Sequence, residues 1–351
     1  MDLVLYAIVY VCDEENRFGS RISQQIFPVT EGKHEKNTSY TFDKVFPPEA
    51  TGGQVYEGTA RSVVEDFLLG YNGLVCCYGQ SQSGKSLTIA SICIHVLQDI
   101  FVHIRQHAAT MQYLVRLAYL EVHNESIIDL VGNKSASISL TMDLIGNFIL
   151  QGHTNEPILS ADHALSCIEA GRTKIIGKNG TSHTILRITM ERERKNSNSP
   201  IHVAMLDIVD LAASHRVTVP PIDKSLLAFG HIIWQLSHHR TTALPYHDSI
   251  LTQILQPTLT PSASLGLICT AAPSIESVGE THQTLKFASR AKRVRLELSL
   301  PVHHGSIQLE IYHRHLDALL SQRHSSDSID NQIKLELAIR NLRQVILNLS
   351  E

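Results

Sequence analysis

The feature that most constrains this chain is the stretch 79–86, which reads Gly-Gln-Ser-Gln-Ser-Gly-Lys-Ser. It matches the phosphate-binding pattern G-x-x-x-x-G-K-[ST], in which glycines let main-chain N–H groups turn toward a β-phosphate. An apolar run at 73–78 precedes the loop and a helical pattern at 87–101 follows it, an order that disfavours a chance Gly/Ser-rich turn. The predicted phosphate-binding residues are Gly79, Gln80, Ser81, Gln82, Ser83, Gly84, Lys85 and Ser86.

The composition is that of a soluble globular protein, with 351 residues, 43% apolar and 18% charged. A net charge of −4 gives no overall attraction to nucleic acid or to anionic lipid, so we predict neither as a partner. The apolar run 3–12 lacks a basic flank and is too short to cross a bilayer. It is therefore interpreted as a strand, not as a signal peptide.

Cysteine and histidine show no metal-binding pattern. The six cysteines contain no C-x-x-C pair, which is typical of reduced core thiols in an intracellular protein. The 20 histidines are scattered, without an H-E-x-x-H or Cys/His spacing. We interpret them as surface imidazoles or as core imidazoles with satisfied hydrogen bonds.

Hydrophobic periodicity predicts strands and helices in alternation along the chain. Strands are expected at 3–12, 40–46, 73–78, 113–122, 184–191, 202–211 and 265–271, and helices at 55–69, 87–101, 160–171, 225–237 and 281–294. Strands interleaved with helices around a phosphate loop predict an α/β fold of the P-loop NTPase kind. Its central sheet is expected to be mostly parallel, with helices on both faces.

The pattern changes after residue 295, so we predict one domain over 1–295 and a helical segment over 296–351. Residues 306–322 form one amphipathic pattern. Apolar residues then follow at heptad spacing, at Leu335, Ile339, Leu342, Ile346 and Leu349. Two heptads are compatible with a short coiled coil that makes a homodimer through 335–349, and equally with a helix packed back on the first domain.

Further motifs stand in a fixed order between residues 40 and 295. They are Tyr71-Asn72-Gly73, Tyr-Leu-Glu-Val-His-Asn-Glu at 119–125, Leu-Asp-Ile-Val-Asp-Leu-Ala-Ala-Ser at 206–214, Ser-Leu-Leu-Ala-Phe-Gly at 225–230, Pro-Tyr-His-Asp-Ser at 245–249 and Thr-Leu-Lys-Phe-Ala-Ser-Arg-Ala-Lys at 284–292. With the phosphate loop, this set resembles the kinesin motor domain. Within that family it is most similar to the CENP-E-like group.

The resemblance implies an ATPase that uses Mg²⁺ and moves along microtubules, in the cytoplasm on the cytoskeleton. Lys85 would hold the β- and γ-phosphates, and Ser86 would bind Mg²⁺. Asp210 begins the second switch and would reach Mg²⁺ through water; its alternative is an ordinary acid at a strand end. The expected catalytic residues are Ser182, Asp210 and Ala213, and the expected metal ligands are Ser86 and Asp210.

The first switch departs from the family pattern G-x-T-x-M-N-x-x-S-S-R-S-H. Gly177 is followed by His183 after six steps, about half of the family spacing. Ser182 or Thr181 is the candidate for the hydroxyl that would touch Mg²⁺ and the γ-phosphate. The neighbouring arginine has no counterpart.

The second switch is altered at two positions. Ala213 occupies the place of the glycine whose N–H meets the γ-phosphate; it keeps the N–H but has less backbone freedom. His215 stands where a glutamate would pair with the lost arginine. Both ends of one salt bridge are thus absent together, which avoids an isolated buried charge. We therefore expect impaired hydrolysis and impaired motility.

The expected microtubule-binding face has lost positive charge. The stretch after Arg216 is shortened, and three cationic positions of P-Y-R-D-S-K-L-T-R-L-L are now His247, Ile250 and Gln253. Three interfacial charges at about 1 kcal/mol each would weaken binding about a hundredfold. The adenine-cupping R-x-R-P is likewise replaced by residues 9–12, Val-Tyr-Val-Cys.

Three readings follow from these departures. The chain is an unusual working motor, or a non-motile pseudo-motor that serves as a structural or interaction module with weak or no turnover. An incomplete gene model would explain the short loops, but it would not explain the substitutions at His247, Ile250 and Gln253, which lie in ungapped sequence. We expect ATP binding with impaired turnover.

Overall fold

The computed structural model describes residues 5–11, 24–26, 40–132, 138–143, 146–177, 180–195, 201–214, 220–240, 243–272 and 278–301. The chain separates into two compact units, Met1–Pro301 and Val302–Glu351. The helices predicted at 306–322 and 335–349 fall outside the described residues, as do His215 and Arg216. The division predicted after residue 295 stays a prediction.

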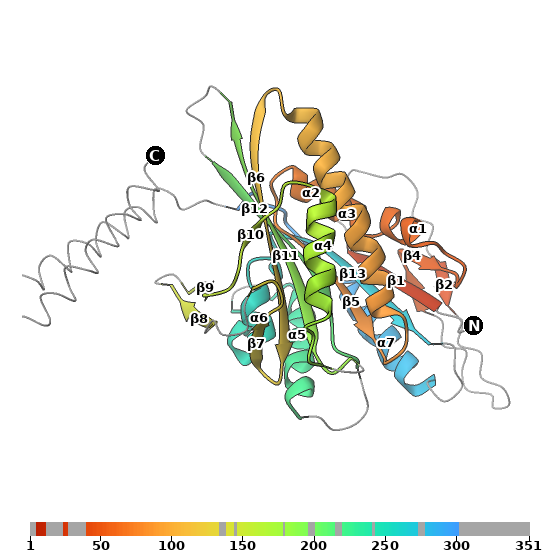
Figure 1. Cartoon of the computed structure of the whole chain (residues 1–351). Coiled ribbons are helices and arrows are strands. Elements are labelled where there is room, and N and C mark those ends of the chain that lie inside the picture. The colour runs from red at the N-terminus through yellow and green to blue at the C-terminus, as the bar shows by residue number, and fades with distance from the viewer. Residues whose placement is uncertain are drawn as a thin grey trace, which may run out of the picture. The chain divides into compact units, whose positions relative to one another are not determined.

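The first unit is built around one central sheet of nine strands (Figure 1). Its order is β10-β6-β11-β12-β5-β13-β1-β4, with β7 paired to β6. The strands are β1 Leu5–Val11, β4 Lys44–Phe46, β5 Gly73–Gly79, β6 Met111–His123, β7 Ser126–Asp129, β10 Glu156–Pro157, β11 His183–Arg194, β12 His202–Asp210 and β13 Ser264–Ala271. Two small hairpin sheets pair β2 Gln24–Ile26 with β3 Tyr40–Phe42, and β8 Ser139–Met142 with β9 Phe148–Gln151.

The sheet is mixed, so the prediction of a mostly parallel sheet was wrong. β5 runs parallel to its two neighbours, β12 and β13, whereas the other described strand pairs are antiparallel. Parallel neighbours need a crossover of about a dozen residues or more. β11 and β12 are joined by residues 195–201 alone, which are too few for such a crossover. The alternation of strands and helices along the sequence thus agrees with the parallel pairing of β5 to β12 and β13. It does not give the direction of the other strands.

Helices cover both faces of the sheet, as predicted. They are α1 Gly52–Glu57, α2 Ala60–Leu68, α3 Lys85–His107, α4 Ala161–Arg172, α5 Pro220–Ser237, α6 Ile250–Leu255 and α7 Val278–Ala291, with the short 3₁₀ helix η1 Tyr246–Asp248. In β5 the buried side chains alternate: Val75 and Cys77 join the core with α1–α4, and Leu74 and Cys76 join the core with α5–α7. In Figure 1, α3 and α4 lie in front of the strands.

Three predicted elements differ from the structure. The helix expected at 55–69 is interrupted, because α1 ends at Glu57 and α2 begins at Ala60. At the break, a Cβ on Gly58 would lie 2.5 Å from the Phe46 ring, so close packing on β4 requires a glycine here. The strand expected at 40–46 is divided into β3 and β4 at Asp43. The helix after the phosphate loop extends six residues beyond 101, to His107.

α3 is the one described helix long and apolar enough to cross a membrane by length and composition. Its most apolar window is 44% buried inside the protein. The helix starts at Lys85, directly after the phosphate loop, and its residues Ile92, Val96 and Ile100 are fully buried in the core. We interpret it as the core helix of the fold.

A buried ion pair connects the sheet to α6. Arg187 on β11 donates two hydrogen bonds of 2.8 Å to the carboxylate of Asp207 on β12, and a third of 2.6 Å to the carbonyl of Ile254. The Thr258 hydroxyl donates to the same carboxylate at 2.6 Å. Arg187 and Asp207 are both buried, so each charge depends on the other for compensation.

Removing the negative charge of this pair is expected to destabilise the domain strongly. Asp207→Asn should lower the free energy of unfolding by about 3–5 kcal/mol, because the guanidinium of Arg187 would stay buried without its counter-charge. The measurement is urea unfolding at pH 7. Glu65→Gln is the matched control, since this carboxylate pairs with Arg61 at 3.1 Å on the surface, where such pairs contribute about 0.5 kcal/mol. Equal losses in the two variants would contradict the prediction.

Candidate functional site

The phosphate loop has the predicted strand–loop–helix arrangement. β5 ends at Gly79, and α3 begins at Lys85. Gly84 has a φ of +92°, a left-handed conformation that suits glycine. A Cβ on Gly79 would lie 2.2 Å from the carbonyl oxygen of Thr270 on β13, so the neighbouring strand also requires glycine at the start of the loop.

The loop residues divide into an outer and an inner set. Ser81, Gln82, Gly84, Lys85 and Ser86 line a pocket of about 310 Å³. Gln80 and Ser83 are buried beneath them. The Ser83 hydroxyl donates to the carbonyl of Gln80 at 2.8 Å and lies 2.6 Å from the hydroxyl of Thr270. The inner set therefore fixes the shape of the loop, and the outer set faces the pocket.

Lys85 places a buried ammonium inside the loop. Its Nζ donates to the carbonyl oxygen of Gln80 at 2.7 Å. Burial lowers the pKa of Lys85, and the nearby Asp210 carboxylate opposes that shift. A buried cation is costly unless an anion compensates it. The phosphates of a nucleotide would supply that anion, so this residue fits the expected ligand.

Ser86 and Asp210 meet on the pocket wall. The Ser86 hydroxyl donates a hydrogen bond to Oδ2 of Asp210. Burial raises the pKa of Asp210, and the Ser86 hydrogen bond and Lys85 oppose this. The other oxygen, Oδ1, is buried and has no hydrogen-bond partner among the described residues. Hard oxygen ligands of this kind suit Mg²⁺, so these two residues fit the expected metal.

The first switch is held at its beginning by a buried glutamate. The main-chain N–H groups of Ile176 and Gly177 donate to the two carboxylate oxygens of Glu121, at 2.9 and 2.7 Å. Ser182 lines the pocket, and its Oγ would lie 2.1 Å from a Cβ on Gly177. The sequence analysis did not identify Glu121 as the residue that holds the first switch. The available signal was a single acid within an apolar strand.

The second switch is hydrogen-bonded to both neighbouring segments. The N–H of Ala213 donates to the carbonyl of Gly180 in the first switch at 2.8 Å. The next N–H, of Ser214, donates to the carbonyl of Gly79 in the phosphate loop at 3.0 Å. The N–H that was expected to meet a γ-phosphate is thus bonded to protein in this structure.

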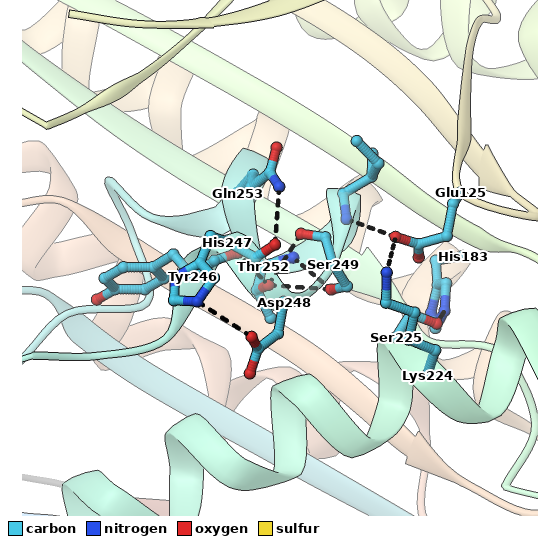
Figure 2. A network of polar contacts seen from close by, with 11 residues as sticks. Glu125, His183, Lys224, Ser225, Tyr246, His247, Asp248, Ser249, Thr252 and Gln253 are labelled. Atoms are coloured by element: carbon cyan, nitrogen blue, oxygen red, sulfur yellow. Dashed lines mark hydrogen bonds and ion pairs between the residues drawn. The ribbon is translucent and has the colours of Figure 1, made fainter.

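His183 connects both switches to α5. Its Nδ1 accepts from the N–H of Ala212 at 2.9 Å, so its Nε2 carries the proton and donates to the hydroxyl of Ser225 at 2.7 Å. Burial lowers the pKa of His183 to about 3, and the ring is therefore neutral. Figure 2 shows His183 next to Ser225. The sequence analysis identified His183 only as the last residue of the first switch.

The three substituted positions of the expected filament face lie on η1 and α6. Figure 2 shows two of them, His247 and Gln253. His247 is 77% exposed in its side chain, and its carbonyl accepts from the Gln253 amide at 3.2 Å. The N–H of Ile250 donates to Glu125 at 2.9 Å, and Glu125 also lies 3.8 Å from Lys224 of α5. One polar network therefore connects the β6–β7 turn, α5 and α6.

The family model of the kinesin motor domain matches residues 10–294. The chain belongs to this family. Among solved structures, the C-terminal motor and motor homology domain of Kar3Vik1, fused to a synthetic heterodimeric coiled coil, superposes with a TM-score of 0.69. That match has 25% identity and covers 77% of this chain and 76% of the other. The predicted family and fold are thus confirmed.

Curated relatives are kinesin-like proteins of greater length. The chain is 36% identical over 286 residues to kinesin-like protein KIN-7M, chloroplastic, of Arabidopsis thaliana, covering 75% of this chain and 27% of the relative. It is 36% identical over 313 residues to KIN-7D, mitochondrial, of the same plant, covering 82% and 30%. Kinesin-related protein 11 of Dictyostelium discoideum is 32% identical over 293 residues, covering 74% and 43%. The chain therefore spans less than half the length of these kinesins.

The neutral His183 of this kinesin motor domain predicts a pH-dependent stability. The unfolded chain has an imidazole pKa of about 6.5 and the folded chain one of about 3, so between these values only the unfolded state binds the proton. The contribution of neutral His183 to the free energy of unfolding is therefore present above pH 6.5 and is lost as the pH falls. Between pH 6.5 and 5 the loss should be about 2 kcal/mol, measured by urea unfolding.

Two variants isolate this contribution. His183→Asn removes the titrating group and should lose about 2 kcal/mol less than the wild type between pH 6.5 and 5. His239→Asn is the control, because His239 is exposed and its φ of +54° is one that asparagine tolerates. It should follow the wild type. The same pH slope in His183→Asn and in the wild type would refute the assignment.

Proposed function

We propose that this kinesin motor domain binds ATP with Mg²⁺ at residues 79–86 and hydrolyses it poorly. The observation that carries the proposal is the buried Lys85 ammonium beside the Ser86–Asp210 hydrogen bond, in one pocket. Lys85 would bind the β- and γ-phosphates, and Ser86 and Asp210 would hold the metal. Mg²⁺ would neutralise the charge on the phosphate oxygens.

We propose poor hydrolysis because the side of the pocket that would contact the γ-phosphate has few hydrogen-bond donors. Ser182 and Ala213 are assigned to this side, and the sequence between Gly177 and His183 contains no arginine. The hydrogen bond from Ala213 to Gly180 further occupies a donor that would stabilise transferred phosphate. Turnover would require this contact to open at each cycle.

The proposed partner is the microtubule, bound more weakly than by a motor with the full set of charges. The replacement of three cationic positions by His247, Ile250 and Gln253 supports this, because charge at such a surface sets the rate and strength of binding. The same observation favours the second candidate function, a non-motile pseudo-motor that serves as a structural or interaction module.

The remaining assignments stay predictions. They are the CENP-E-like grouping, a homodimer through 335–349, and a cytoplasmic, cytoskeletal location. The names of two relatives place those proteins in the chloroplast and the mitochondrion, so family membership alone does not select a compartment.

Lys85→Ala is expected to abolish measurable nucleotide binding. Loss of the ammonium should weaken affinity for a fluorescent ATP analogue by at least about a hundredfold, since charge-assisted bonds to phosphate are lost. Fluorescence titration with Mg²⁺ is the measurement. Lys286→Ala, at an exposed position of α7, removes the same charge elsewhere and should bind like the wild type. Retained affinity in Lys85→Ala would refute the site, and microtubule-stimulated phosphate release at the rate of an active kinesin would refute poor hydrolysis.

Restoring the three charges should restore filament binding. The triple variant His247→Arg, Ile250→Lys and Gln253→Arg is expected to bind microtubules about a hundredfold more tightly in co-sedimentation at low salt. The gain should shrink as salt is raised, because exposed charges are screened.

A control variant adds the same charge to the opposite side of the sheet. Gln98→Arg, Gln106→Arg and Ala109→Lys lie at exposed positions on α3 and in the turn after it. Their effect should be several-fold smaller than that of the α6 triple variant. Equal gains in both variants would show that net charge, and not this surface, determines binding.

A further inference from the structure

Two main-chain donors of the second switch are already used within the protein. Ala213 donates to the carbonyl of Gly180, and Ser214 donates to the carbonyl of Gly79, at 2.8 and 3.0 Å. These bonds tie the second switch to the first switch on one side and to the phosphate loop on the other. They lie where the chain leaves Asp210, next to the pocket.

The local shape is built for the contact between Gly180 and Ala213. Gly180 has a φ of +77°, and a Cβ on it would lie 3.3 Å from the Cβ of Ala213. A larger residue at either position would push the two segments apart. The contact thus depends on glycine at 180 and on a small residue at 213.

Both flanks of Gly180 are anchored by buried groups. Before it, Glu121 accepts from the N–H groups of Ile176 and Gly177. After it, His183 is bonded to the N–H of Ala212 and to the hydroxyl of Ser225. Since only six steps separate Gly177 from His183, the first switch has little chain with which to move away.

The sides of the pocket that would bind the β-phosphate and the γ-phosphate therefore differ in how many hydrogen-bond donors are available. An ammonium has three N–H donors, so Lys85 can bind a phosphate while it keeps its bond to Gln80. A γ-phosphate, by contrast, gains the N–H of Ala213 or Ser214 only if a bond to Gly180 or Gly79 breaks. Gly79 is buried, so its carbonyl would be left unpaired, whereas the carbonyl of the exposed Gly180 would bond to water. The bond lost within the protein therefore offsets part of the gain from the new bond to phosphate.

We propose that this pocket is a nucleotide site whose two switches contribute little to the binding of a γ-phosphate. The inference rests on the proposed nucleotide site and specifies how it treats its ligand: the phosphate loop supplies most of the affinity, so the diphosphate and the triphosphate bind with similar strength. A ligand shifts a conformational equilibrium only through its different affinity for the two states. The switches and α5 accordingly keep one arrangement with either nucleotide.

The test compares two fluorescent nucleotides on the full chain with Mg²⁺. A labelled ADP and a labelled, non-hydrolysable ATP analogue should have dissociation constants within about threefold of each other. In Gly180→Ala the added Cβ strains the contact with Ala213 and releases the donor. Preference for the ATP analogue should then increase by at least about threefold.

Gly146→Ala is the matched control. Gly146 also has a positive φ, of +90°, but a Cβ on it meets nothing within 4 Å. It imposes the same kind of backbone strain away from the pocket and should leave the ratio of affinities unchanged.

The outcomes separate this inference from the proposed function. A preference of more than about threefold for either nucleotide in the wild type would overturn the inference and leave the nucleotide site intact. An unchanged ratio in Gly180→Ala would also overturn it. If neither nucleotide binds, the proposed site is wrong and the inference falls with it.

Discussion

The site depends on the position of β5 between two parallel neighbours. β12 and β13 pair with β5 in the same direction, so the three strands end at one edge of the sheet. The phosphate loop leaves β5 at this edge, and Asp210 stands at the end of β12. Thr270 on β13 bonds to the inner side of the loop. The parallel triplet thus brings the groups proposed to bind phosphate and metal together.

Buried polar groups connect this edge to the helices that cover the far face. Each is either neutral or compensated: His183 is an uncharged imidazole with both nitrogens bonded, and Arg187 is paired with Asp207. Glu121 accepts two main-chain N–H groups. Satisfied groups of this kind specify one arrangement of their partners. In this chain they fix the first switch, α5 and α6 relative to the pocket, which is consistent with a static site.

Much of the fold was readable from local pattern. The phosphate loop, its strand and its helix were predicted where they occur, because glycine spacing and apolar periodicity are local signals. The mixed pairing of the sheet was not, since strand direction depends on which strands become neighbours. The break at Gly58 was also missed; this glycine packs against Phe46, a contact between segments that periodicity does not show.

The sequence by itself determined the phosphate-loop motif, the short first switch and the loss of three cationic positions, since each is a matter of residue type and spacing. Only the tertiary structure decided how these parts are used. It joined the N–H of Ala213 to Gly180 and placed His183 between Ala212 and Ser225. Hydrogen bonds between residues far apart in the chain depend on distance and direction in space, which residue types along a chain do not encode locally.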